Sequence, residues 1–147
     1  RACAKAPRCR RDYMAKISGP LLDRFDMLIE VSEVPISALS DHRSGETSQD
    51  IACRVQDARM RSFQREEQSD GIINAQLDGA KLETVMQMSA DDRAFLTNSA
   101  ETLRLSARGY HRVMRVARSV ADLDGSDTVS RSHIAEAMHY RSLPPLS

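Results

Sequence analysis

The pattern of apolar and polar residues predicts one short strand followed by a series of helices. The run at 27–31 is mostly apolar, short and soon followed by Pro35, which favours a buried strand over a helix. A loop over 32–46 separates this strand from the rest of the chain. Before the strand, residues 9–17 can form a short helix that ends ahead of Pro20, because the residue before a proline is disfavoured in the helical region.

Beyond the loop, apolar residues recur with helical spacing, and capping residues mark where the helices begin. Thr47 with Asp50 three residues later resembles a capping box and predicts the start of a long helix. The expected fold class is therefore mainly α. The predicted helices cover 48–67, 79–88, 90–103, 106–123 and 131–141, with a minimal strand at Thr128–Val129 before the last one.

Arg24 lies directly before the predicted strand, on a short and helical lead-in. A guanidinium is always charged and binds phosphate in a bidentate fork, and a rigid base next to a core strand suits that task. Judged from the residues alone, an arginine in this place more often meets solvent or a nearby carboxylate such as Asp23 or Asp26. Both interpretations stay open on these grounds.

The helix predicted at 106–123 is amphipathic. At about 100° per residue, its apolar residues share one face, and the opposite face holds Arg108, Arg112, Arg115 and Arg118. A solvated basic face explains this pattern, although the use of arginine without lysine favours anion contacts slightly. Arg108 is further distinguished by its place in the first turn, where free N–H groups and the helix dipole favour an anion.

Composition is that of a globular protein. The chain has 147 residues, enough for one domain, of which 41% are hydrophobic and 29% charged. No apolar run approaches the roughly 20 residues that span a bilayer and no signal peptide is present, so we expect a cytoplasmic protein without a membrane partner. The 21 basic and 21 acidic residues give a net charge of zero, which does not indicate a nucleic-acid binder.

Three blocks of the sequence resemble a known family. The segment Ser18-Gly19-Pro20-Leu21-Leu22-Asp23-Arg24-Phe25-Asp26 resembles the arginine-finger segment of AAA+ ATPases in the magnesium-chelatase and MCM-helicase branch. Two further blocks make the chain similar to the magnesium-chelatase-like ComM/YifB family, and the final helix up to Arg141 fits as well. They are Arg11-Asp12-Tyr13 and Ser106-Ala107-Arg108-Gly109-Tyr110-His111-Arg112.

The resemblance implies a C-terminal fragment of an AAA+ ATPase. Residues 1–46 would be the end of the ATPase core, with the finger segment and the last strand. Residues 47–143 would form the helical lid domain, in which the helix at 48–67 is the long insertion of this branch, and 144–147 would be a tail. The chain also begins at Arg1 without an initiator methionine, which predicts a piece of a longer protein.

The resemblance also implies roles for two arginines. Arg24 would be the arginine finger, which acts in trans on ATP held by a neighbouring subunit of a ring, expected to be a hexamer. Arg108 would be the sensor-2 arginine, which contacts the ATP phosphate from the lid. Besides its own ATPase core and the neighbouring subunits, DNA would be a partner, because ComM-type motors are associated with DNA remodelling.

ATP and Mg²⁺ would be cofactors of the longer protein only. The chain has no G-x-x-x-x-G-K-[ST] loop and no apolar strand ending in Asp-Glu, so we expect the fragment to be inactive alone and to bind neither cofactor. Cys3 and Cys9 do not have a recognised zinc spacing and, like Cys53, are expected to be free thiols. The resemblance makes Cys3 and Cys9 weak zinc candidates in the longer protein, and no metal site is expected here.

Two other functions remain open. One is a non-enzymatic helical DNA-binding module in which the arginines of 108–118 contact phosphates. Its affinity for DNA would fall steeply as the salt concentration rises. Aromatic residues are only 4% of the chain, which argues against stacking on single strands. The other is a chelatase-type motor for metal insertion into tetrapyrroles, as in true magnesium chelatases.

Overall fold

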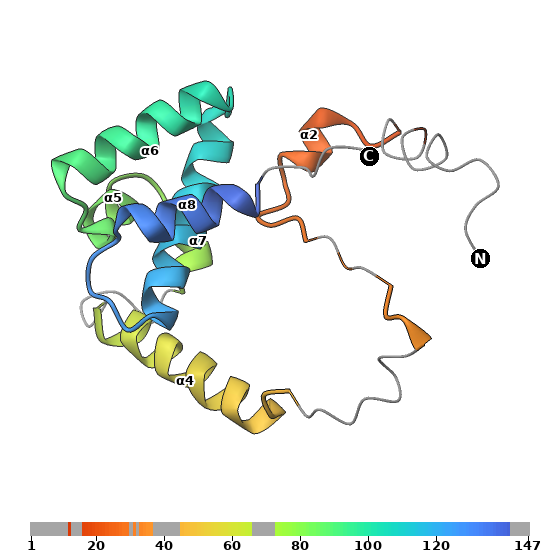
Figure 1. Cartoon of the computed structure of the whole chain (residues 1–147). Coiled ribbons are helices and arrows are strands. Elements are labelled where there is room, and N and C mark those ends of the chain that lie inside the picture. The colour runs from red at the N-terminus through yellow and green to blue at the C-terminus, as the bar shows by residue number, and fades with distance from the viewer. Residues whose placement is uncertain are drawn as a thin grey trace.

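The computed structural model describes residues 12, 16–29, 31, 33–36, 45–65 and 73–141. Over these residues the chain is mainly helical, as the sequence predicts, and most of its helices gather in one bundle (Figure 1). The elements are α2 (Gly19–Leu22), α4 (Ser48–Arg65), the 3-10 helix η1 (Asn74–Gln76), α5 (Gly79–Met86), α6 (Ala90–Thr102), α7 (Ala107–Leu123) and α8 (Arg131–His139).

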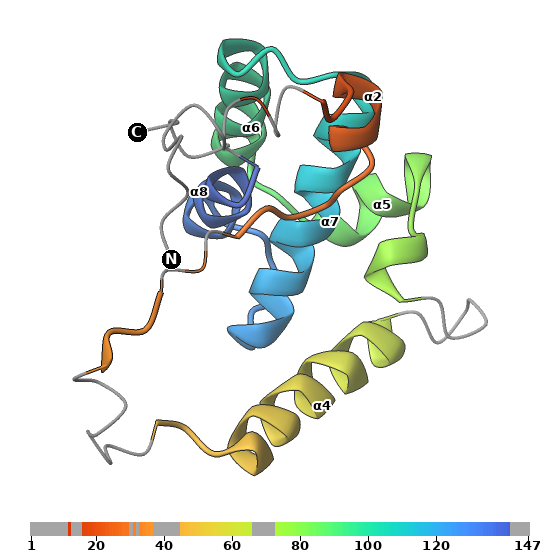
Figure 2. The ribbon, with the colours of Figure 1, turned by 90° about the vertical axis from the view of Figure 1, so that its right-hand side faces the viewer.

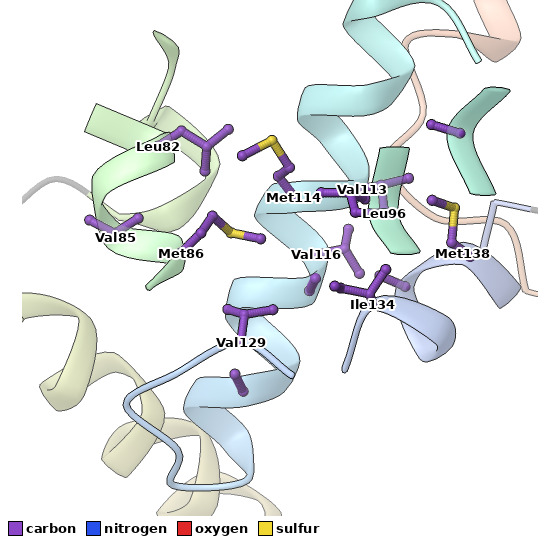
Figure 3. Packing of buried hydrophobic residues seen from close by; sticks show 14 of the residues in the cluster. Leu82, Val85, Met86, Leu96, Val113, Met114, Val116, Val129, Ile134 and Met138 are labelled. Carbon is purple, nitrogen blue, oxygen red and sulfur yellow. The ribbon is translucent and has the colours of Figure 1, made fainter. Parts of the chain in front are cut away.

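Helix α7 is the central element of the bundle. Helices α4, α5 and α8 and the turn η1 contact it, and α6 packs on α8. The core lies between these helices, where Met114 of α7 faces Leu82 and Met86 of α5 (Figure 3). The fully buried apolar side chains of the described part include Leu82, Met86, Leu96, Met114, Ala117, Ala121 and Ile134. Their removal from water is the main force that holds the helices together.

Capping residues set the helix starts at the places that the sequence predicts. The hydroxyl of Ser106 accepts a hydrogen bond from the Gly109 N–H at 3.0 Å, and Ser89 accepts one from Asp92 at 3.1 Å. At the start of α4, the Asp50 N–H donates to Thr47 Oγ1 at 3.2 Å. Each bond satisfies an amide that has no partner within its own helix.

Neither of the two predicted strands forms a β-ladder within the described residues. Residues 27–29 and Val31 are extended but pair with no neighbouring strand in the part of the chain that the structure describes. The Leu28 N–H instead donates to the Tyr140 carbonyl at 2.8 Å, and Val129 donates to Met86 at 3.1 Å. A single bond of this kind does not make a ladder, and a lone strand leaves its remaining backbone groups to water.

Some predicted bounds are corrected, and others lie outside the described residues. Helix α5 ends at Met86 and not at residue 88. Helix α8 ends at His139, so Arg141 lies in the turn that follows it. Of the helix predicted at 9–17, only Asp12, Lys16 and Ile17 are among the described residues, and residues 66 and 67 at the end of the predicted long helix also lie outside them.

Helix α4 lies along the opposite end of the bundle from α2 (Figures 1 and 2). Its last turns pack against α7, where Ser62 is buried and its hydroxyl donates to Asn74 Oδ1 at 3.2 Å. Much of its remaining surface is exposed, including the apolar side chains of Ile51, Val55 and Met60. The helix is therefore attached to the bundle along one side only.

Candidate functional site

Arg24 lies in the turn that follows α2, at the end of the molecule where α7 begins (Figure 2). Its backbone N–H donates to the Leu21 carbonyl at 2.9 Å, which completes a tight helical turn. Its side chain is exposed, and within the described part of the chain it makes no ion pair or hydrogen bond. Of the two partners expected from the residues alone, solvent or a carboxylate such as Asp23 or Asp26, the described structure shows solvent.

The carboxylates next to Arg24 are used elsewhere. Asp23 accepts hydrogen bonds from Arg141 Nη2 at 2.8 Å and from the Ser106 hydroxyl at 2.7 Å. Asp26 forms an ion pair with Arg112 of α7. Both acids thus contact the bundle, and neither pairs with Arg24 among the described residues.

Arg108 is the second residue of α7, and its side chain is exposed. It too makes no ion pair or hydrogen bond with the residues that the structure describes. Because the Asp23 carboxylate contacts Ser106, the residue that caps α7, Arg24 and Arg108 lie at the same end of the bundle. Exposed guanidinium groups without a partner among the described residues, at an end of the bundle where a helix begins, are of a kind that can bind a phosphate.

The other three arginines of α7 are not on a solvated face, which corrects the expectation from periodicity. Arg112 pairs with Asp26, and Arg115 donates from Nε to the Leu77 carbonyl at 2.6 Å. Arg118 is fully buried. The reason is that α7 is the central helix: α4, α5 and α8 all pack on it, so its polar side also lies against protein.

Arg118 belongs to a buried polar network that sequence reasoning missed. Its Nη2 donates to Asp122 one turn further on at 3.0 Å, and its Nη1 donates to the Asp127 carbonyl at 2.8 Å. Asp122 also accepts from Asn74 at 2.7 Å and forms an ion pair with Arg65 of α4. Burial lowers the pKa of the Arg118 guanidinium, and the Asp122 carboxylate acts in the opposite direction. The network joins α4 and η1 to α7.

No metal site is present among the described residues, since they hold no group of three His, Cys, Asp or Glu side chains that could bind an ion. Cys53 is an exposed free thiol on α4. Cys3 and Cys9 lie outside the described residues. A search of the described helices found none long and apolar enough to cross a membrane.

Comparison with protein families assigns the chain. A family model described as magnesium chelatase, subunit ChlI C-terminal, matches residues 45–141, and a second, described as magnesium chelatase, subunit ChlI, matches residues 1–39. The chain belongs to the magnesium chelatase family. Arg24 lies in the part matched by the ChlI model, and Arg108 lies in the part matched by its C-terminal counterpart.

Similar curated proteins confirm the resemblance to the ComM and YifB branch of this family. The chain is 38% identical over 132 residues to "Competence protein ComM" of Haemophilus influenzae. The matched residues cover 89% of the chain and 25% of that protein. It is 36% identical over 135 residues to "Uncharacterized protein YifB" of Salmonella typhimurium, covering 91% of the chain and 26% of that protein. The chain thus spans about a quarter of the length of these relatives.

Proposed function

We propose that this chain is the lid and arginine-finger portion of a magnesium-chelatase-like AAA+ ATPase. The observation that carries the proposal is the pair of exposed arginines, Arg24 and Arg108, at the end of the bundle where α7 begins, which form no ion pair or hydrogen bond among the described residues. Neither is needed by a partner in the described structure, whereas the three other arginines of α7 are engaged. Free guanidinium groups suit the charge that develops on a transferred phosphoryl group.

ATP with Mg²⁺ would supply the reacting phosphoryl group in the longer protein, held by a nucleotide-binding core. Arg24 and Arg108 would bind its phosphate oxygens and offset their negative charge. We propose that Arg24, whose side chain is exposed, acts on ATP held by a neighbouring subunit. The proposal therefore includes an oligomeric ring, with six subunits as the expected number.

The extended segment after α2 supports attachment to such a core. Its apolar side chains are exposed, with Ile29 at 67% and Val31 at 87%, and Phe25 and Met27 are also largely open to water. Their alternate spacing is that of a strand with one buried face. In the longer protein this segment would pair with the sheet of the ATPase core, which would cover these side chains.

DNA remodelling in a cytoplasmic ring is the process we propose for the motor, because the name of one similar protein links it to competence. A helical DNA-binding module without ATPase activity is disfavoured, since the basic face on which it depends is largely engaged inside the protein. The ChlI matches keep metal insertion into a tetrapyrrole as the second candidate.

Arg108→Ala tests the proposal in the full-length protein. We expect ATP turnover to fall at least about tenfold, which corresponds to roughly 1.4 kcal/mol of lost transition-state stabilisation. Arg59→Ala is the matched control: Arg59 is an exposed arginine on α4, at the far end of the bundle, and its loss should change turnover less than twofold. Equal losses for the two variants would contradict a specific role for Arg108.

The same substitution should hardly affect folding. Because the Arg108 side chain is exposed and has no partner among the described residues, Arg108→Ala should change the free energy of unfolding of this chain by less than about 0.5 kcal/mol. Thermal or urea denaturation followed by circular dichroism measures it. A large loss would mean that Arg108 supports the lid, and the fall in turnover would then have a structural cause.

A further inference from the structure

The segment that carries Arg24 is held to the bundle by contacts on both sides of that residue. Arg141, in the turn after α8, donates from Nη2 to the Asp23 carboxylate at 2.8 Å and from Nη1 to the Phe25 carbonyl. One planar guanidinium therefore holds the residue before Arg24 and the residue after it. The Arg141 side chain is only 8% exposed, and its bond to Asp23 is partly buried.

Ser106 links the same carboxylate to the start of α7. Its hydroxyl donates to Asp23 Oδ2 at 2.7 Å while it accepts the Gly109 N–H at 3.0 Å. One hydroxyl can do both, since it has one donor and two acceptor positions. The cap of the helix that carries Arg108 is thus bonded directly to the residue next to Arg24.

Gly109 allows these groups to come together. A Cβ atom at this position would lie 3.2 Å from Arg141 Nη2, which is closer than most Cβ contacts, and 3.4 Å from Ser106 Oγ, which is about van der Waals contact. Two further contacts extend the attachment: Asp26 pairs with Arg112, and the Leu28 N–H donates to the Tyr140 carbonyl at 2.8 Å.

We propose that Asp23, Ser106 and Arg141 form a latch that holds the backbone at Arg24 at a fixed place relative to the start of α7, so that Arg24 and Arg108 can reach one phosphate group together. The three latch residues are positioning residues, because they act through Arg24. The role of the latch in turnover rests on the proposed function, whereas its effect on the mobility of the segment does not. A flexible side chain on a fixed base needs less ordering when it binds, and small displacements of such groups are costly in catalysis.

The substitution Ser106→Asp tests the contact of Ser106 with Asp23 apart from its role as the cap of α7. Aspartate caps a helix as well as serine does, but its ionised carboxylate cannot donate to Asp23 and repels it. In this chain we expect hydrogen exchange of the amides at 23–28 to become about tenfold faster or more, while amides in the middle of α7 keep their protection. Ser106→Thr retains the hydroxyl and should exchange like the original protein.

The exchange result decides whether the latch exists. Unchanged exchange at 23–28 in Ser106→Asp would overturn it. Equal acceleration at 23–28 and throughout α7 would also overturn it, because the substitution would then have disturbed the helix and not a contact with the segment.

Arg141→Lys tests the role of the latch in the full-length protein. Lysine keeps the charge but lacks the planar fork, so it cannot hold Asp23 and the Phe25 carbonyl together. We expect kcat for ATP to fall about tenfold with KM unchanged, as for an interaction made in the transition state. Arg141→Lys combined with Arg24→Ala should be no slower than Arg24→Ala alone. Glu83→Gln, which breaks the exposed ion pair with Arg93, is the control and should leave turnover as it is.

Failure of the latch and failure of the proposed function give different results. If Arg24→Ala removes turnover but Arg141→Lys leaves it within twofold, the latch has no positioning role and the proposed function stands. If Arg24→Ala leaves turnover intact, the proposed function fails, and the exchange measurement still decides whether the latch holds the segment.

Discussion

Replacing Asp122 with alanine is expected to lower the free energy of unfolding of this chain by about 3–5 kcal/mol, because it leaves buried positive charge without its partner. Asp122 is 1% exposed, and it pairs with Arg118, which is fully buried, and with Arg65. The Nε of Arg118 and the Nη1 of Arg65 already lack hydrogen-bond partners within the described residues. Asp122 is thus the carboxylate that both guanidinium groups contact.

Urea denaturation of the chain measures this loss, and Asp124→Ala is its control. Asp124 lies two residues further on, its side chain is 71% exposed, and among the described residues it contacts His133 Nε2 at 3.1 Å and no other side chain. Its removal should cost less than about 1 kcal/mol, as is usual for exposed pairs. A loss below about 1 kcal/mol for Asp122→Ala as well would show that water or a rearranged side chain compensates Arg118.

Much of the bundle could be predicted because its helices are encoded locally. Thr47 with Asp50, Ser89 and Ser106 each supply an oxygen within three residues of the amide that needs it, so the helix starts can be found in a short window of sequence. The strand at 27–31 failed for the opposite reason. Its apolar spacing is strand-like, but a ladder needs a partner strand, and none lies within the described residues.

The two exposed arginines of the candidate site could be proposed from sequence, but their surroundings could not. Arg108 is recognised by its place in the first turn of an amphipathic helix, which is a local property. The burial of Arg118 depends on how α4 and η1 pack on α7, and periodicity shows only that a residue faces away from one apolar side. The periodicity places all four arginines of α7 on the same face. Only the packing shows that three of them have partners among the described residues and that Arg108 has none.

The latch could not be predicted for a related reason. Arg141 and Asp23 are 118 positions apart, and no pattern within either segment indicates that they meet. A signal was present at Gly109, a glycine inside a helix that otherwise favours side chains, since such a residue often marks the close approach of another group. That signal gives the place of a contact but not the identity of the partner.

Arg24→Ala is expected to have the largest effect on activity. In the full-length protein it should reduce ATP turnover by about 10³-fold or more, as for the loss of an arginine that offsets charge in phosphoryl transfer. Nucleotide binding should remain close to normal, because the groups that hold ATP would belong to the ATPase core. Steady-state hydrolysis and nucleotide titration measure the two effects separately.

Mixed rings test whether Arg24 acts across a subunit interface. Arg24→Ala subunits keep an intact nucleotide site, while subunits with a defective nucleotide-binding loop keep Arg24, so a shared interface can contain one working copy of each part. Mixing the two inactive proteins should therefore restore some turnover. If the mixture stays inactive although the two variants assemble together, Arg24 acts within its own subunit. The nucleotide bound by the same chain would then have to lie close to the exposed side chain of Arg24, beside the start of α7.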